Sequence, residues 1–350
     1  MRSVSVVVPT YRRRDALPRF LDAILRQPAA EVVVAVDGSR DGSVELLRER
    51  ARRDERIVVL DLPHRGAGGA RQAGVVAASG DVVLLLDDDV IASPGLIEGH
   101  ARHHVDLEPK LVLGYMPNDW RTVPPAHRAN AWVYRYWYEV HCARYAAEPR
   151  FVLTNLWGGN LSMPRDAMLR IGFESLSVRR GQDDRDFGLR CAKAGVASLF
   201  DRSLHGLHLY DRPVPAFRED SRLQGECRRL LRAAHPDLLG DPRESSKLDD
   251  TVGMRLPGPL RRLLPMAASD PLYEPVTRSL EVAHRAGVRI GHLGLEVLAT
   301  RGLASLDVMR GILDVSARLR DQPPPLKHVH GGVVARDAAD APAAPSRRAA

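Results

Sequence analysis

Cysteine is scarce in this chain of 350 residues. The three cysteines, Cys142, Cys191 and Cys227, are far apart and odd in number. They match neither the spacing of a structural zinc site nor the framework of a disulfide-stabilised domain. We therefore expect buried free thiols and a fold that depends on its hydrophobic core.

Long hydrophobic runs are also missing. The aliphatic runs at residues 32–36 and 82–86 have five residues each, far from the ~18 that would span a bilayer. The start of the chain resembles a secretion signal only superficially, because its apolar run is short and Pro9 and three arginines follow at once. The sequence predicts no integral membrane segment and a cytoplasmic location.

Lysine is nearly absent. Of the 51 basic residues only four are lysine, and the other 47 are arginine. Arginine binds phosphate groups through two parallel hydrogen bonds, so this bias suits a protein that handles phosphates. The basic residues are spread along the chain and no nucleic-acid-binding motif accompanies them, so we do not expect nucleic acid as a partner.

The first ninety residues alternate strand and helix patterns. Runs rich in valine and leucine predict strands at residues 4–8, 31–36, 57–60 and 82–86, with helices between them at residues 15–27, 43–53 and 69–79. Such alternation is typical of an α/β, Rossmann-like fold with a mostly parallel sheet and helices on both faces. Polar clusters follow the strands, and they should meet in one crevice beyond the carboxyl ends.

The rest of the chain divides by composition. We expect residues 1–90 and 91–215 to be two halves of one α/β domain. Residues 216–321 have leucine-rich periodic stretches and predict a helical extension. Residues 322–350, rich in proline, alanine and arginine, predict a disordered tail.

Three consecutive carboxylates end the strand at residues 82–86. In extended geometry Asp87 and Asp89 point to one side and Asp88 to the other. Two carboxylates on one side of a crevice favour a hard divalent cation, Mn²⁺ or Mg²⁺. Phosphate groups can supply the remaining ligands of such an ion. From these residues alone, a solvated acidic turn is an equal alternative.

The motifs, taken in order, resemble the family 2 glycosyltransferases of GT-A fold. They are VVVPTYR at residues 6–12, VAVDGSRDGS at 34–43, GARQAG at 69–74, LDDD at 86–89, GGNLS at 158–162 and DDRDFGLR at 183–190. The resemblance implies that residues 1–90 are the nucleotide-binding half of a GT-A domain and residues 91–215 the acceptor and catalytic half.

The resemblance also implies roles for single residues. Asp89 corresponds to the acid that holds the metal ion, Mn²⁺ or Mg²⁺. From the residues alone, Asp37 fits a simple turn equally well, and Arg71 a solvated helix position. The positions that correspond to the family's nucleotide contacts are Pro9, Thr10, Arg12, Asp37, Arg71, Asp87 and Asp88.

The second catalytic element is the acidic pair at the start of a predicted helix. By correspondence, Asp184 takes the position of the general base, and Asp183 is the other acid of the pair. A helix N-terminus stabilises an ionised carboxylate, although one acid can instead cap the helix. The family usually has Gly-Glu-Asp here, and this chain has Gln182 before the pair, which puts the role of Asp183 in doubt.

A histidine is the expected third metal ligand. His205 and His208 follow a predicted strand at residues 196–200, and both are candidates. The segment around His208 resembles the metal-binding histidine region of related GT-A enzymes, so we favour it over His205. We expect the neighbouring His103 and His104 to lie on the surface.

The acceptor side is indicated by aromatic residues and a glycine turn. Six aromatic residues between 132 and 145 could bury the seam between the two halves or form a platform for the acceptor. Sugars and lipids stack on aromatic faces, so the segment Trp157, Gly158, Gly159 and Asn160 is the predicted acceptor-binding site.

The function implied is transfer of a sugar from a nucleoside-diphosphate sugar, with UDP favoured, to an acceptor hydroxyl with inversion. The acceptor classes left open are natural products, peptides and cell-envelope precursors. A sugar nucleotidyltransferase would carry a glycine-rich loop after the first strand, which is missing here. A non-catalytic nucleotide-sugar-binding protein would not need Asp89 and Asp184. A dinucleotide-binding site fails because the spacing of Gly66 and its neighbours does not match G-x-G-x-x-G.

Overall fold

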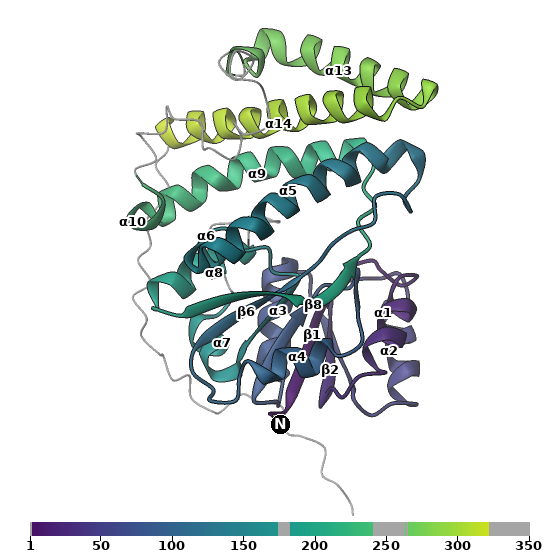
Figure 1. Cartoon of the computed structure of the whole chain (residues 1–350), viewed down its shortest axis with the longest axis vertical. Helices are drawn as coiled ribbons and strands as arrows, with labels where there is room; N and C mark the ends of the chain where they lie inside the picture. The colour runs from purple at the N-terminus through teal and green to yellow at the C-terminus, as the bar shows by residue number, and fades with distance from the viewer. Residues whose placement is uncertain (1, 174–182, 241–262, 264, 322–350) are drawn as a thin grey trace, which may run out of the picture.

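One eight-stranded sheet runs through the α/β part of the molecule, in the order β3-β2-β1-β4-β7-β6-β8-β5 (Figure 1). The structure is a computed structural model, and it describes residues 2–173, 183–240, 263 and 265–321. It confirms the predicted α/β architecture. Helices cover both faces of the sheet, and a helical region follows it.

The first half of the sheet is parallel. Its strands are β1 (Val4–Thr10), β2 (Glu31–Asp37), β3 (Ile57–Leu62) and β4 (Val82–Leu86). The connecting helices are α1 (Leu17–Ile24), α2 (Ser43–Ala51) and α3 (Gly66–Ala77). Every residue of β4 is buried, because helices lie on both sides of it. This explains why the strand reads as a continuous apolar run.

The second half of the sheet is mixed, and the sequence predicted little of it. Its strands are β5 (Val90–Ala92), β6 (Lys110–Tyr115), β7 (Asn160–Pro164) and β8 (Ala197–His208). Strand β7 runs antiparallel to both of its neighbours, β4 and β6. Strand β8 has 12 residues, so His205 and His208 lie within it and do not follow it.

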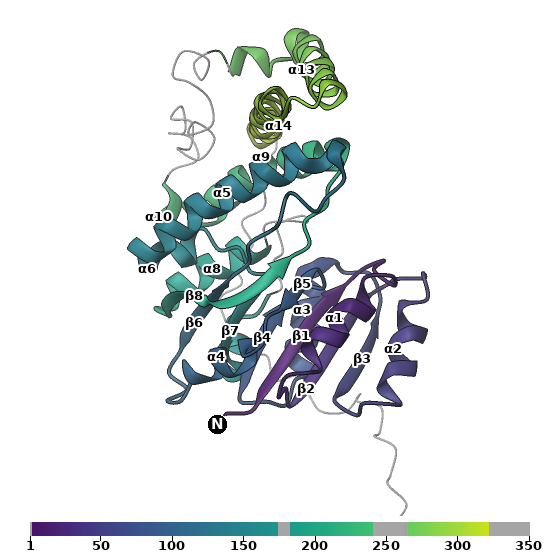
Figure 2. The same ribbon diagram turned by 45° about the vertical axis from the view of Figure 1, so that its right-hand side comes forward.

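The remaining helices lie around the second half and beyond it (Figure 2). They are α4 (Leu96–Arg102), the 3₁₀ turn η1 (Pro125–His127), α5 (Arg128–Ala147), α6 (Pro149–Thr154), α7 (Arg165–Ile171), α8 (Asp183–Lys193), α9 (Val214–Ala234), α10 (Pro236–Leu239), α13 (Asp270–Ile290) and α14 (Leu293–Asp321). Helix α5 lies next to β8, α14 packs on both α5 and α9, and α13 is outermost.

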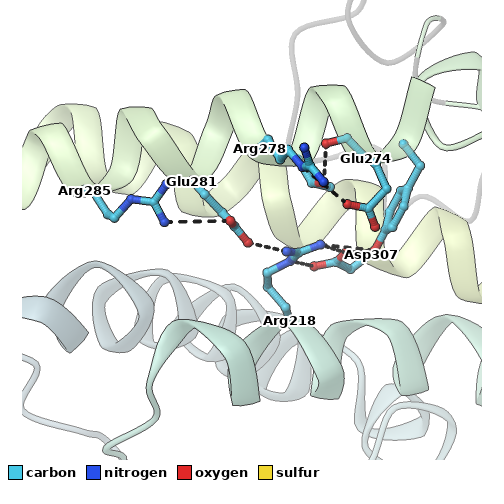
Figure 3. Close-up of polar contacts among 8 residues, drawn as sticks. Arg218, Glu274, Arg278, Glu281, Arg285 and Asp307 are labelled. Atoms are coloured by element: carbon cyan, nitrogen blue, oxygen red, sulfur yellow. Dashed lines mark hydrogen bonds and ion pairs between the residues drawn. The ribbon is translucent and has the colours of Figure 1, made fainter. Parts of the chain in front are cut away.

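A cluster of charges joins the three C-terminal helices (Figure 3). Arg218 of α9 donates two hydrogen bonds to Asp307 of α14, at 2.9 and 3.1 Å. The same guanidinium contacts Glu281 and the hydroxyl of Tyr273, both on α13. Asp307 is 1% exposed, so one arginine neutralises a buried carboxylate and links three helices.

Several expectations about the whole chain can now be compared with the structure. The three cysteines are buried and free, as predicted, and burial raises the pKa of each thiol to about 12. Within the described ranges, no helix is both long and apolar enough to cross a membrane. The boundary drawn at residue 90 falls inside β5, and that at 215 falls inside α9. The predicted tail at 322–350 lies outside the described residues.

Candidate active site

Side chains from separate segments meet beyond the carboxyl ends of β1 and β4. The hydroxyl of Thr10 donates to Asp88 at 2.6 Å, and both residues are buried. Burial, together with the charge of Asp89, raises the pKa of Asp88 to about 7. The hydrogen bond between Thr10 and Asp88 therefore connects the ends of β1 and β4 in the interior of the protein. Asp87 and Asp89 remain more exposed.

Asp89 lies between two basic groups. Its Oδ2 accepts a hydrogen bond of 2.7 Å from Arg13, and its Oδ1 lies 3.3 Å from Nε2 of His208. Burial alone would raise the pKa of Asp89, but His208 and Arg13 lower it to about 2. Asp89 is thus a permanent anion at the crevice.

His208, rather than His205, is the histidine beside the acidic turn. Its Nδ1 lies 3.0 Å from the hydroxyl of Tyr134 on α5. Burial disfavours the imidazolium, but Asp89 offsets this and raises the pKa of His208. His205 turns elsewhere, because its Nδ1 pairs with the hydroxyl of Ser93 at 2.7 Å.

The donor set fits a divalent ion that is shared with a phosphate ligand. Within the described parts of the chain, no group of three or more His, Cys, Asp or Glu side chains forms a metal cage. Asp89 and His208 supply one carboxylate and one imidazole. Mg²⁺ and Mn²⁺ are commonly held in this way, by few protein ligands together with substrate phosphates. The hydroxyl oxygen of Tyr134 can accept a hydrogen bond from Nδ1–H of His208, which leaves the Nε2 lone pair available.

Arg71 of α3 joins the two catalytic segments. Its guanidinium donates to Asp87 at 2.9 Å and to Asp184 at 2.7 Å. Arg71 is 6% exposed, so this cation is almost removed from water. Burial raises the pKa of Asp87, and Arg71 acts against that rise. The two carboxylates are therefore held near each other by one buried charge.

The acidic pair lies at the start of α8, and its members have different surroundings. Asp184 accepts from the backbone N–H of Gly158 at 2.9 Å, in addition to its bond with Arg71. Asp183 reaches the first turn of α3, where its carboxylate receives a backbone hydrogen bond from Gly68. Burial, reinforced by the charge of Asp184, raises the pKa of Asp183. Only Asp184 contacts both the predicted acceptor loop and Arg71.

Asp37, the last residue of β2, holds the segment that leads from β3 into α3. It accepts from the backbone N–H groups of Arg65 at 2.6 Å and Gly66 at 2.9 Å. These groups begin α3, so Asp37 fixes that helix start and is not a simple turn residue. Arg12 adopts a left-handed backbone, with φ of 54°, and its N–H bonds to Ser39. Pro9 lies within β1, opposite Ala35.

The predicted acceptor loop lies against the acidic turn. The carbonyl of Gly159 accepts from the backbone N–H of Asp87 at 3.1 Å. A Cβ on Gly159 would lie 2.5 Å from Oδ2 of Asp87, so only glycine fits there. Trp157 is partly buried against Tyr134 and Tyr138, at ring distances of 5.3 and 5.4 Å. Trp137, Tyr138 and Tyr145 of α5 are buried, whereas Tyr136 is exposed, and Tyr134 lies between Trp157 and His208.

Asn160, the last residue of the predicted acceptor loop, lies in the protein core. It is fully buried, and its amide donates to the carbonyl of Leu204 at 3.0 Å. Its Oδ1 pairs with Nε2 of His100 at 2.9 Å, and Nδ1 of His100 pairs with Ser162 at 2.8 Å. The expectation that Asn160 contacts the acceptor is wrong for this conformation, because both ends of its amide are used in the core.

The histidine pair that directly follows α4 also differs from expectation. His104 is fully buried, and its Nε2 pairs with Ser162 at 2.8 Å. His103 is partly buried and pairs with Asp201 at 2.8 Å. The prediction that both lie on the surface is wrong, because the turn after α4 brings His104 against β7 and His103 against β8.

Two residues of the site were missed from the sequence. Arg13 lies in a run of three arginines, and the sequence does not say which of them turns toward the acids. Tyr134 is one of six aromatic residues on α5, and helical spacing alone does not distinguish it. The only available signals were the basic run after the first strand and the aromatic helix as a whole.

Comparison with known proteins supports the architecture of the site. The sequence profile of "Glycosyl transferase family 2" matches residues 5–172. Validoxylamine A glucosyltransferase of Streptomyces hygroscopicus is 29% identical over 264 residues, which cover 67% of this chain and 62% of that protein. Glucosyl-dolichyl phosphate glucuronosyltransferase of Haloferax volcanii is 27% identical over 184 residues, 51% of this chain and 58% of that one. The chain thus spans less than two thirds of the length of these relatives.

A solved structure shares the fold. The mannosyltransferase PcManGT of Pyrobaculum calidifontis, solved in complex with GDP-Man and Mn²⁺, aligns with a TM-score of 0.53. The alignment covers 87% of this chain and 86% of that one at 18% sequence identity, and it bears on the fold alone. The family match and the GT-A architecture agree with the motifs read from the sequence, and residues 5–172 of this chain belong to glycosyltransferase family 2.

Proposed function

We propose that this protein transfers a sugar from a nucleoside-diphosphate sugar to an acceptor hydroxyl. The observation that carries the proposal is the bridge made by Arg71, which joins Asp87 to Asp184 in one crevice. Arg71 thereby holds together Asp87, which follows a strand of the proposed nucleotide-binding half, and Asp184, which lies beside the proposed acceptor loop. Transfer needs both groups close to one reacting carbon, and such positioning contributes strongly to rate.

Asp184 is the proposed general base. It is held on one side by Arg71 and on the other by the N–H of Gly158. Both contacts orient the carboxylate, which accepts the proton of the acceptor hydroxyl as its oxygen attacks the anomeric carbon. Direct attack from the side opposite the leaving group inverts that carbon. General-base assistance of this type is typically worth about 10²–10⁴-fold in rate.

We propose Mn²⁺ or Mg²⁺ as the cofactor, held by Asp89 and His208. Bound there, such an ion neutralises negative charge on the diphosphate leaving group. Tyr134 orients the imidazole of His208, and Thr10 holds Asp88, the middle and most buried acid of the turn, by a hydrogen bond. The nucleotide contacts remain those proposed from the sequence, with Asp37 acting through the start of α3.

The donor base and the acceptor are finer proposals. UDP is our first choice, and GDP is the main alternative because PcManGT was solved with GDP-Man. A small natural product is the acceptor class to assay first, since one relative is named a validoxylamine A glucosyltransferase. A lipid phosphate is the second class, following the name of the Haloferax relative.

A thermal-shift experiment tests this function. The protein is heated with UDP, GDP, dTDP or CDP, with and without Mn²⁺, because a ligand of the native state raises stability by RT ln(1 + [L]/Kd). We expect one nucleotide to raise the melting temperature only when Mn²⁺ is present. The sugar nucleotide of that base is then assayed for hydrolysis and transfer. Binding without turnover would indicate a non-catalytic nucleotide-sugar-binding protein, and release of pyrophosphate from a sugar phosphate and a nucleoside triphosphate would indicate a nucleotidyltransferase.

A further inference from the structure

Arg13 has a fixed backbone and a side chain that reaches into the crevice. Its carbonyl accepts from the N–H groups of Ala16 and Leu17, at 2.9 and 3.0 Å, at the start of α1. Its side chain is 38% exposed, and it extends to the acidic turn. One guanidinium nitrogen lies 2.7 Å from Asp89, and Nε lies 3.5 Å from Asp88.

The position of this guanidinium matters for any cation that binds Asp89. Oδ2 of Asp89 is occupied by Arg13, and Oδ1 faces His208. The third acid of the turn, Asp87, already has a cation of its own in Arg71. Arg13 is therefore the cation that Asp88 and Asp89 share when neither donor nor metal is bound, while His208 faces the other oxygen of Asp89.

Exposure distinguishes the two arginines of the site. Arg71 is nearly enclosed, with 7% of its side chain exposed, and its two partners come from separate elements, Asp87 directly after β4 and Asp184 on α8. Arg13 is open to the crevice on one side. A divalent ion at Asp89 would repel the guanidinium, whereas the diphosphate that accompanies it would attract the same group through two hydrogen bonds. Arg13 can exchange one anion for the other with its backbone unchanged.

We propose that Arg13 is an internal counter-ion that makes metal binding depend on the nucleotide. Without nucleotide, a divalent ion must displace Arg13 from Asp89 with no new partner for the guanidinium. With nucleotide, Arg13 moves onto the diphosphate, so metal and nucleotide bind with positive coupling. This inference rests on the proposed function, because it assumes that the crevice takes a metal ion and a nucleoside diphosphate.

The experiment measures Mn²⁺ affinity of the full chain by electron paramagnetic resonance, without nucleotide and with saturating UDP or GDP. Four proteins are compared: the natural chain, Arg13→Gln, Arg13→Lys and Arg14→Gln. Arg14 is the matched control, because it lies in the same loop and its side chain pairs with Asp15 instead of the acidic turn. Melting temperature and circular dichroism establish that each variant is folded.

For the natural chain we expect nucleotide to tighten Mn²⁺ binding by about tenfold or more, within the usual range of coupling between sites. Arg13→Gln should bind Mn²⁺ alone about tenfold more tightly than the natural chain, and its coupling should fall to roughly threefold or less. Arg13→Lys keeps the charge and should retain most of the coupling. Arg14→Gln should behave like the natural chain.

Two results would overturn the inference in distinguishable ways. If Arg13→Gln binds Mn²⁺ alone no more tightly than the natural chain and keeps the full coupling, Arg13 is not the counter-ion, while the proposed function stands. If the natural chain binds none of UDP, GDP, dTDP and CDP in the presence of Mn²⁺, the proposed function and the inference fail together.

Discussion

At the scale of single residues, the site has more carboxylates than arginines, so each arginine neutralises two carboxylates. Asp87 and Asp184 share Arg71, whereas Asp88 and Asp89 share Arg13, and Asp89 also faces His208. A buried carboxylate that loses its only cation is strongly destabilised. Substitutions in this crevice must therefore be read against a folding control.

The catalytic base gives the first prediction. Asp184→Asn keeps the size of the side chain and can still accept from Gly158, but it takes up no proton at neutral pH. We expect near-normal donor binding and a loss of transfer of about two to four orders of magnitude. Asp183→Asn should instead change stability or KM more than kcat, because Asp183 contacts the start of α3. Donor binding by calorimetry and steady-state kinetics check both variants.

The contrast between the two variants is informative. An active Asp184→Asn beside an inactive Asp183→Asn would assign the base to Asp183. If both remained active, another group would take the proton, and the inverting mechanism proposed above would be wrong.

The choice between the two histidines gives the second prediction. His208→Ala should weaken the Mn²⁺-dependent part of nucleotide binding. Tyr134→Phe should have a smaller effect, of up to about 10–100-fold in affinity, because Tyr134 only orients the imidazole ring. His205→Ala should leave it nearly unchanged, since His205 pairs with Ser93. Nucleotide titrations with and without Mn²⁺ measure this. A larger effect from His205→Ala would reverse the assignment.

The sequence motifs predicted most of the crevice, but they left this choice open for a geometric reason. His205 and His208 are three positions apart, and in a strand residues separated by an odd number point to opposite faces. The sequence predicts a strand that ends near residue 200, which leaves both histidines outside it, so the alternation of a strand does not separate them. Once β8 extends to His208, one histidine turns toward Asp89 and the other toward Ser93.

At the scale of elements, the parallel strands were predictable and the mixed ones were not. Strands β1, β2 and β4 are buried on both faces, which gives continuous valine and leucine runs. Strand β8 is largely half-exposed and carries polar residues such as Asp201 and Arg202. It pairs with β6 and β5, which are far from it in the sequence, and the residues of β8 itself show no pattern that predicts this pairing.

The ion cluster of the C-terminal helices gives the third prediction. Arg218→Met removes the guanidinium that neutralises Asp307, so a buried carboxylate loses its cation. Breaking such a pair typically costs about 3–5 kcal/mol, and we expect a clear fall in the free energy of unfolding measured in urea. Arg285→Met is the matched control. Its side chain is 69% exposed and lies 3.9 Å from Glu281, so it should change stability little. Equal effects of the two variants would contradict this account of the cluster.

At the scale of the whole molecule, acid should destabilise the fold through two buried histidines. Burial lowers the pKa of His100 to about 3 and that of His104 to about 4. The unfolded chain protonates histidine near pH 6.5. Between pH 6.5 and about 4 the unfolded state therefore binds more protons than the folded one, and stability falls as the pH falls.

The fourth prediction isolates one of these histidines. Each contributes a slope of up to about 1.4 kcal/mol per pH unit in that window. His104→Gln can still donate to Ser162 but does not titrate, so its unfolding free energy should fall less steeply than that of the natural chain. Val105→Ala, at an exposed non-titrating neighbour, should keep the natural slope. Urea unfolding at several pH values between 7 and 4.5 measures the difference, and an unchanged slope in His104→Gln would contradict the assignment.

Strand β7 determines where this chain can be recombined with a relative. It lies between β4 and β6, so hydrogen bonds connect residues 82–86 to residues 160–164 and onward to β6. A chimera joined near residue 90 would give β4 a foreign neighbour and divide β5. A junction at residues 209–213, after β8 and before α9, keeps every strand pair within one parent. Engineers who wish to exchange donor preference should therefore transplant the entire sheet, and exchange the helical region separately.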